Sequence, residues 1–231
     1  SLPRAANTAN RRETRKMLTA EALRQRAAHA LHGEPSQEVF DPTRTVNRAR
    51  SDFDLDGGRD ARALAHGPAR QAAVLFPIVL RERPTVLLTE RSADLPSHAG
   101  QIAFPGGKVE PHDHDELETA LRETREEIGL EQSWIEPLGY LDNYRTGTNF
   151  NIVPVVGLVT PGFTLEIDTR EVAAVFEVPL DFLLDPANHE LHQREWRGRM
   201  RTYYAMPYEG HYIWGATAGM IRNFHERMQA G

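Results

Sequence analysis

Residues 122–130 read RETREEIGL, and the rest of the chain is organised around this stretch. As a helix, it places Glu123 and Glu127 one turn apart on the same face, with Glu126 beside them. Carboxylates this close repel one another unless a cation neutralises them, and all-oxygen ligands suit Mg²⁺ or Mn²⁺. A mixture of Arg and Glu is more often a solvated helix surface. The capped helix and the paired glycines upstream of it favour the metal site.

The sequence around this stretch predicts a helix over residues 116–128. Asp115 followed by Glu118 is typical of an N-cap with a capping box, and Gly129 of a left-handed C-cap. Apolar spacing of three and four residues predicts a core-facing stripe, made of Leu117, Leu121, Thr124 and Ile128. Upstream, residues 104–108 read FPGGK, a turn whose glycines let the backbone approach a ligand. A glycine carbonyl of this turn is a candidate metal ligand.

These features together resemble the Nudix hydrolase signature, which is Gly, five residues, Glu, seven residues, then Arg-Glu-apolar-x-Glu-Glu-x-Gly-apolar. The second half matches at residues 122–130, with Thr124 at the apolar position. In the first half one residue is inserted if Gly107 is the signature glycine and Asp113 replaces the glutamate. The resemblance implies an α/β/α sandwich with a mixed sheet, and metal ligands at Gly107, Glu123, Glu126 and Glu127. It also implies that Arg122 orients the carboxylates.

One branch of the family is indicated by residues 87–107. LLTERS at 87–92, then Gly100, then FPGG at 104–107 resembles the coenzyme A pyrophosphatases, which tolerate the inserted residue. The resemblance implies Mg²⁺- or Mn²⁺-dependent hydrolysis of coenzyme A or its acyl derivatives to adenosine 3′,5′-bisphosphate and (acyl-)4′-phosphopantetheine, with Glu126 as catalytic carboxylate.

Two alternatives to coenzyme A hydrolysis stay open. The branch usually has a basic residue four positions before the glycine, where this chain has Pro96. ADP-ribose or NADH is therefore an alternative substrate. A catalytically silent, nucleotide-sensing Nudix domain is a second alternative, but such domains often lose the glutamates that this chain retains.

Further substrate contacts are expected from three residues. Arg91 and Lys108 are the nearest cations for a substrate phosphate, and Arg91 is the nearest candidate in sequence for the 3′-phosphate of coenzyme A. His98 precedes Ala99-Gly100 in the approach loop and is expected to contact substrate. A surface charge, or for His98 a structural role, is the alternative in each case. Glu171 and Glu177 are candidates for one more metal ligand or a base.

Composition excludes several other functions. The formal net charge is -6 and the pI about 5.9, which argues against binding nucleic acid through a broad basic surface. The absence of cysteine excludes disulfides, zinc–thiolate sites and thiol nucleophiles. No apolar run is long enough to span a bilayer and no signal-peptide pattern is visible. We therefore expect a cytoplasmic protein that binds neither nucleic acid nor a membrane. The resemblance implies a small-molecule nucleotide substrate, and a homodimer is left open.

The chain divides into three parts by pattern. Residues 1–16 are polar and basic and are predicted to be a disordered tail. Residues 17–70 are predicted to hold a helix from Thr19 to Leu31, ended by Gly33, and an irregular connection anchored by Phe40, Phe53 and Leu55. Residues 71–231 are predicted to be the Nudix hydrolase domain.

Within this domain the apolar pattern predicts a hairpin of strands at 72–80 and 85–89 and a short strand at 102–104. Beyond the helix it predicts strands at 135–144, 152–158, 172–178 and 199–206 and a short helical turn at 179–184. The closing helix is predicted over 214–228, with one face formed by Thr217, Ile221, Phe224 and Met228.

Overall fold

The computed structural model describes residues 18–37, 50–56, 68–95 and 98–230. The predicted tail at 1–16, Phe40 and Pro96 lie outside this part. The helices are α2 (Ala20–Ala30), α3 (Glu116–Ile128), α4 (Leu180–Leu183) and α5 (Gly215–Ala230), with 3₁₀ turns η1 (Asp54–Asp56), η3 (Gln132–Trp134) and η4 (Pro186–Asn188). None of the helices described there has the length and apolar character that crossing a membrane requires.

Nine of the described strands form one mixed sheet. They are β1 (Arg50–Ser51), β2 (Arg70–Val79), β3 (Thr85–Arg91), β4 (Ile102–Ala103), β5 (Gly106–Lys108), β6 (Ile135–Tyr140), β7 (Tyr144–Arg145), β8 (Phe150–Val159) and β9 (Val172–Pro179). The longest path through the sheet is β1-β7-β8-β2-β3-β4, in which β1–β7 and β2–β8 are parallel. A second, antiparallel sheet contains β10 (Glu190–Trp196), β11 (Arg199–Tyr208) and β12 (His211–Trp214).

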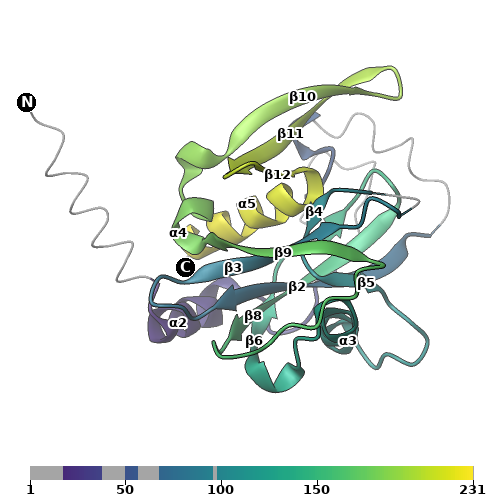
Figure 1. Cartoon of the computed structure of the whole chain (residues 1–231). Helices are drawn as coiled ribbons and strands as arrows, with labels where there is room; N and C mark the ends of the chain where they lie inside the picture. Colours follow the sequence, from purple (N-terminus) through teal and green to yellow (C-terminus); the bar gives the residue numbers. More distant parts are fainter. Residues whose placement is uncertain (1–17, 38–49, 57–67, 96–97, 231) are drawn as a thin grey trace, which may run out of the picture.

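Alternation along the central strands gives the main sheet two buried faces. In β2, Ala73 and Leu75 pack with Ala120 and Ile128 of α3. On the other face, Phe76 and Ile78 pack with residues of α2 and α5, including Phe224. Figure 1 shows α3 below the sheet and α5, with the three-stranded sheet, above it. The predicted α/β/α sandwich with a mixed sheet is confirmed.

Helix α3 has the predicted bounds because its ends carry local capping chemistry. The Asp115 side chain accepts from the Glu118 N–H at 2.8 Å. The Glu118 carboxylate accepts from the His114 N–H instead of from Asp115, so the capping box reaches one residue further back than predicted. Gly129 adopts φ +69°, and a Cβ there would lie 2.7 Å from the Glu166 backbone nitrogen. Only glycine satisfies both conditions.

The buried stripe of α3 differs in part from the prediction. Thr124 and Ile128 are fully buried as expected, but Leu117 and Leu121 are only partly buried against the core. Thr119 and Ala120 are fully buried instead.

The hairpin of β2 and β3 forms as predicted, with Ile78 opposite Val86. The single strand predicted at 135–144 is wrong, because it divides into β6 and β7. At the break, the Asp142 N–H donates to the Asn223 side chain of α5 and not to a neighbouring strand. A further register shift lies between Pro137 and Gly139.

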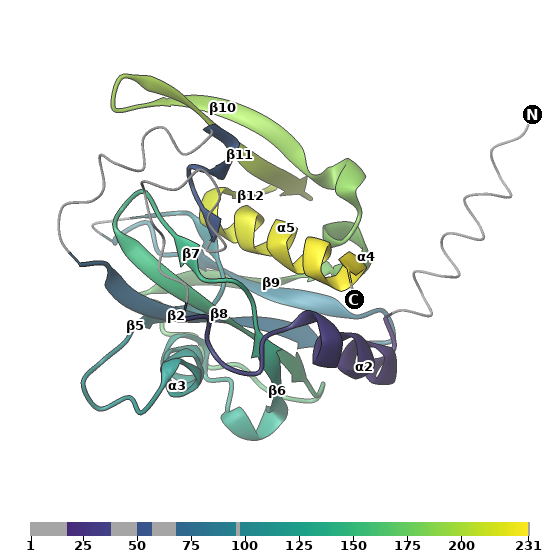
Figure 2. The ribbon, with the colours of Figure 1, turned by 180° about the vertical axis from the view of Figure 1, so that it is seen from behind.

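The N-terminal helix α2 begins at the predicted cap, where Thr19 Oγ1 accepts from the Ala22 N–H at 3.2 Å. Gly33 does not end it, since Leu31 is the extended C-cap and His32 exchanges both backbone hydrogen bonds with Tyr140 of β6. Figure 2 shows α2 next to β6 and α5.

The segment 50–56 confirms one predicted anchor and contradicts another. Phe53 is 1% exposed beneath the Arg201 guanidinium, whereas Leu55 is 36% exposed because the η1 turn points it to solvent.

The C-terminal region contains strands that the pattern did not predict. Strand β10 is mostly exposed on both faces, so it has no apolar alternation to detect. Strand β12 is also additional, and α5 begins at Gly215 and not at Trp214. The predicted buried face of α5 is confirmed at Thr217, Ile221, Phe224 and Met228.

Candidate active site

The two glycines after Phe104-Pro105 bring backbone directly against the helix carboxylates. Strand β5 pairs with β2, placing Gly107 opposite Ala73. A Cβ on Gly106 would lie 2.4 Å from the Ala73 carbonyl oxygen, and one on Gly107 would lie 2.5 Å from both Glu123 carboxylate oxygens. A side chain at Gly106 would push β5 away from β2, and one at Gly107 would displace the Glu123 carboxylate. The turn therefore holds the Gly107 backbone beside Glu123.

Arg122 connects this turn, the loop before α3 and two carboxylates. Its Nη2 donates to the Lys108 carbonyl oxygen at 3.2 Å, and its Nη1 donates to Glu123 at 2.9 Å and Glu126 at 3.1 Å. Its Nε and Nη2 hold Asp113 at 2.8 and 2.9 Å. This supports the expected orienting role of Arg122.

Asp113 is the anchor of that arrangement. Its side chain is fully buried, and it also accepts from the Thr119 hydroxyl and the Glu110 N–H, both at 2.8 Å. The hydrogen bonds from Arg122 hold the pKa of Asp113 well below its ordinary value. Asp113 is thus a permanent anion whose charge fixes the guanidinium.

Glu127 is the most buried carboxylate of the site, with 5% of its side chain exposed. It accepts from the Gly106 N–H at 3.1 Å. Burial raises the pKa of Glu127 to about 8, and the nearby charge of Glu123 adds to the rise. Burial likewise raises the pKa of Glu123, with Glu126 contributing in the same direction. The charged forms of Glu123 and Glu127 are therefore disfavoured unless a cation binds beside them.

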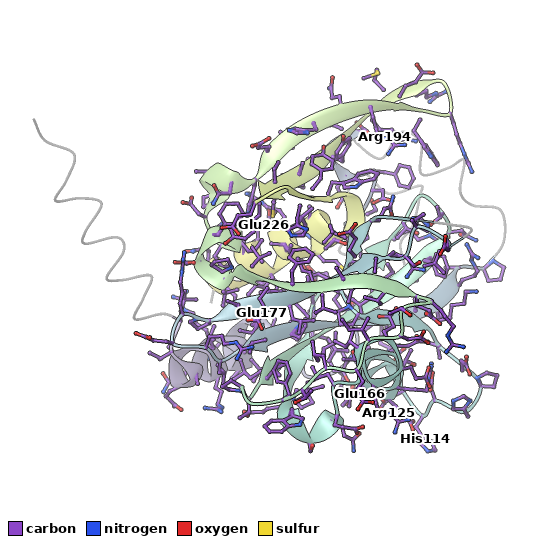
Figure 3. The ribbon with its side chains drawn as sticks, in the orientation of Figure 1. His114, Arg125, Glu166, Glu177, Arg194 and Glu226 are labelled. Carbon is purple, nitrogen blue, oxygen red and sulfur yellow. The ribbon has the colours of Figure 1, made fainter. Side chains whose placement is uncertain are left out.

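Arg91 and Glu126 complete the set of charged side chains near Glu123 and Glu127. The Arg91 Nη1 is 4.0 Å from the Glu127 carboxylate, and its buried Nε has no hydrogen-bond partner in the described part of the chain. The Glu126 side chain is 54% exposed and lines an open hollow with Arg125, Glu131 and Glu166. In Figure 3, Arg125 and Glu166 lie close together beside α3.

The other predicted residues lie in different settings. His98 is exposed with φ +59°, and its Nδ1 lies 2.8 Å from Gln101 Oε1. Lys108 contributes its carbonyl to Arg122, while its side chain points outward and is exposed. Glu177 is held by Arg81 at 2.6 Å on β9, away from α3 (Figure 3). Glu171 is the nearer of the two candidate acids, since its charge acts on Glu123 and Glu127.

Comparison with known proteins decides the family. The NUDIX domain model matches residues 69–200, more than half of the chain. The chain belongs to the Nudix family. A Nudix hydrolase NudL from Yersinia enterocolitica is 38% identical over 192 residues, covering 83% of this chain and 97% of that protein. A second NudL, from Photorhabdus laumondii, is 41% identical over 160 residues, 69% of this chain and 86% of the relative.

Solved Nudix structures are also similar. The NUDIX domain of Shewanella oneidensis NrtR, complexed with ADP ribose, is 20% identical with a TM-score of 0.46, covering 73% of this chain and 98% of that one. Nudix hydrolases act on pyrophosphate bonds of small nucleotide substrates and generally use divalent ions such as Mg²⁺ or Mn²⁺. This chain is a hydrolase of that class.

The Nudix site fits a hard divalent cation by its donor chemistry. In the described residues, no three Asp, Glu or His side chains are already gathered as closely as a metal site would need. Glu123 and Glu126 instead converge on Arg122, and Glu127 faces Gly106. The donors are all oxygen, the Gly107 backbone reaches Glu123, and a cation would reverse the raised pKa values of Glu123 and Glu127.

Two features of the Nudix site were visible in the sequence only in part. Asp113 was recognisable by counting six residues from Gly107, but its bidentate bond to Arg122 requires the fold. The Gly106 N–H that binds Glu127 had no distinct signal beyond the paired glycines.

Proposed function

We propose that this Nudix hydrolase cleaves the diphosphate bond of coenzyme A or its acyl derivatives. The observation that supports the proposal is the position of residues 87–95 and 98–107 beside the helix carboxylates. Strand β3 ends at Arg91, which faces Glu127, and the chain returns through Gly100, whose N–H donates to the Arg91 carbonyl at 3.0 Å. It then enters β4 and the FPGG turn. The stretch that resembles the coenzyme A branch thus builds one wall of the site.

In the proposed mechanism, Glu123, Glu126, Glu127 and the Gly107 carbonyl would hold Mg²⁺ or Mn²⁺. Such an ion neutralises phosphate oxygens and lowers the pKa of bound water. Arg122 keeps Glu123 and Glu126 in position while Asp113 keeps Arg122 in position. Glu126 takes the proton of the attacking water, since its exposed carboxylate can reach solvent.

Three side chains would bind the substrate in this proposal. Arg91 lies beside Glu127, which supports a contact between its guanidinium and the diphosphate at the reacting end. Lys108 is exposed at the end of β5 and is available to a flanking phosphate. His98 lies in the approach loop, where its ring is exposed.

The deciding experiment is product analysis with kcat/KM for coenzyme A, an acyl-coenzyme A, dephospho-coenzyme A, ADP-ribose and NADH. We expect the highest value for coenzyme A or its acyl form, with adenosine 3′,5′-bisphosphate as one product. A preference for ADP-ribose or NADH would overturn the coenzyme A assignment. No turnover of any of these in Mg²⁺ or Mn²⁺, combined with tight nucleotide binding, would favour a sensor.

The cytoplasmic location and the homodimer stay predictions.

A further inference from the structure

One face of the three-stranded sheet carries aromatic side chains that the proposed mechanism does not use. His192 on β10 pairs directly with Tyr203 on β11, and Arg194 lies two residues along on the same face. On β12, Tyr212 and Trp214 pair with Pro207 and Ala205 of β11. These two residues lie four and two positions after Tyr203, so they are on the same face of the strand. We call these five side chains the aromatic face: His192, Arg194, Tyr203, Tyr212 and Trp214.

The rings of the aromatic face contact one another and leave one surface open. The Tyr203 and Trp214 centroids are 5.2 Å apart, and the Tyr212 and Trp214 rings are stacked at 6.3 Å. Tyr212 is 40% exposed. The Tyr212 hydroxyl lies 2.7 Å from His192 Nδ1 and 3.1 Å from the Tyr203 hydroxyl. Burial raises the pKa of Tyr212 to about 12, so the phenol stays neutral at physiological pH.

Arg194 adds a cation to this surface. Its guanidinium carbon is 4.9 Å from the Trp214 ring centroid, and its side chain is exposed. A guanidinium that lies over a ring keeps N–H donors at its edge for an anion. No carboxylate pairs with Arg194 in the part of the chain that the structure describes. The exposed aliphatic side chains Leu191 and Met200 lie on the opposite face of this sheet.

The aromatic face is connected to the reacting end of the site through β12 and β4. Strand β12 lies against β4, and Thr217, three residues after Trp214, donates to the Ile102 carbonyl at 3.0 Å. From Ile102 the chain needs four residues to reach Gly106, a span of at most about 14 Å. The Gly106 N–H then meets Glu127 at 3.1 Å. Figure 3 shows Arg194 and Arg125 of α3 on opposite sides of the main sheet. A substrate that reached both would have to cross an edge of that sheet, and β4 is the last strand of its order.

We propose that the aromatic face binds the adenine of the substrate and that Arg194 pairs with the phosphate on its ribose. This rests on the proposed function and deepens it. Flat rings with phenol groups suit a nucleobase, which stacks and accepts hydrogen bonds. Arg91 is placed at the diphosphate end beside Glu127, so the 3′-phosphate needs another cation, and Arg194 has the charge and exposure to supply it.

The test is calorimetric titration of the full chain with adenosine 3′,5′-bisphosphate and with AMP. Arg194→Gln should weaken adenosine 3′,5′-bisphosphate about tenfold and leave AMP within twofold. Tyr212→Leu should weaken both about tenfold, as expected for a lost base–aromatic contact. Leu191→Ala is the matched control, because Leu191 lies on β10 with Arg194 but on the opposite face of the sheet. It should bind both nucleotides like the wild type. Circular dichroism melts verify that each variant is folded.

Wild-type affinity for adenosine 3′,5′-bisphosphate in both Arg194→Gln and Tyr212→Leu would overturn the proposal. So would the absence of measurable binding of either nucleotide to the wild type. If the two variants changed only the sedimentation behaviour, the aromatic face would be assigned to a second copy of the chain, and the proposal would again be wrong. Failure of the coenzyme A assignment is a separate outcome, because AMP binding and its dependence on Tyr212 do not require coenzyme A turnover.

Discussion

Arg122 holds both oxygens of Asp113 through one edge of its guanidinium, with Nε 2.8 Å from Oδ1 and Nη2 2.9 Å from Oδ2. The remaining Nη1 donates to Glu123 at 2.9 Å. A residue in the loop before α3 therefore sets the position of a carboxylate on the helix itself. A planar, bidentate pair of this kind fixes orientation as well as charge.

Asp113→Asn should lower both stability and activity. The variant exchanges a charge-assisted pair for neutral hydrogen bonds, which should reduce the free energy of unfolding by roughly 1.5 to 3 kcal/mol at pH 7. Because Arg122 lowers the pKa of Asp113, this contribution is complete above the ordinary aspartate pKa of about 3.9 and is lost as pH falls below it. Urea unfolding of both proteins at pH 7 and pH 3 is the measurement. A difference that does not shrink at pH 3 would contradict the role of this charge.

Gly107→Ala should damage activity more than stability. The new Cβ would lie 2.4 to 2.5 Å from the Glu123 carboxylate atoms, so that side chain must move. We expect kcat to fall at least about a hundredfold, since small misplacements of site groups have effects of this size. Gly33→Ala is the control, because a Cβ there meets nothing within 4 Å. Near wild-type turnover in Gly107→Ala would show that Glu123 need not lie against this backbone.

Local chemistry explains which parts of the fold could be predicted from sequence. The bounds of helix α3 were predicted correctly because its caps, Asp115 and Gly129, contact residues only three and four positions away in sequence. Strand β10 was not predicted because its side chains face solvent on both sides, so burial left no alternation.

The site was predictable only as far as it lies on one helix. Glu123, Glu126 and Glu127 follow from helical spacing, but their different burial depends on what packs over α3. Glu171 and Glu177 were indistinguishable in sequence, and the pairing of β9 with β3 and the Arg81 contact separate them. The aromatic face could not be anticipated, because strand register assembles it from three strands.

Arg91→Ala should reduce kcat/KM on coenzyme A and on dephospho-coenzyme A by the same factor, about ten- to a hundredfold. The guanidinium lies 4.0 Å from Glu127, at the reacting end that both substrates share. The sequence alone had suggested a larger loss on coenzyme A through its 3′-phosphate. Steady-state rates on the two substrates distinguish these views. A selective loss on coenzyme A would place the 3′-phosphate at Arg91 and not at Arg194.

Glu126→Gln should abolish most activity and leave folding unchanged. It keeps the shape of the side chain but removes a charge needed for metal binding and proton transfer, so we expect a fall of roughly a thousandfold, or about 4 kcal/mol. An exposed position such as this one should change stability by no more than about 0.5 kcal/mol. Glu131→Gln, which lines the same hollow, is the control. If Glu126→Gln turned over substrate at the wild-type rate in saturating Mg²⁺, Glu126 would have no catalytic or metal-binding role.

Glu127→Gln should also lose activity, yet it should stabilise the metal-free protein at alkaline pH. Burial raises the pKa of Glu127 to about 8, so the folded state holds this proton more tightly than the unfolded chain, where the pKa is about 4.3. Folding stability attributable to this group is therefore complete below the unfolded pKa of about 4.3 and is lost as pH rises from there through the folded pKa of about 8. A neutral glutamine can still accept from the Gly106 N–H and avoids the loss.

The measurement is urea unfolding in a chelating agent at pH 5 and pH 8.5, followed by the same titration in Mg²⁺. Relative to the wild type, Glu127→Gln should gain on the order of 1 to 4 kcal/mol between the two pH values. Added Mg²⁺ should stabilise the wild type far more than the variant, because an ion that binds the folded state shifts unfolding by mass action. Equal stabilisation of both proteins by Mg²⁺ would mean that Glu127 is not a ligand. If the difference in free energy of unfolding between Glu127→Gln and the wild type did not change with pH in the chelating agent, the protein itself would already neutralise the buried Glu127 charge. Arg91 is the nearest cation able to do so.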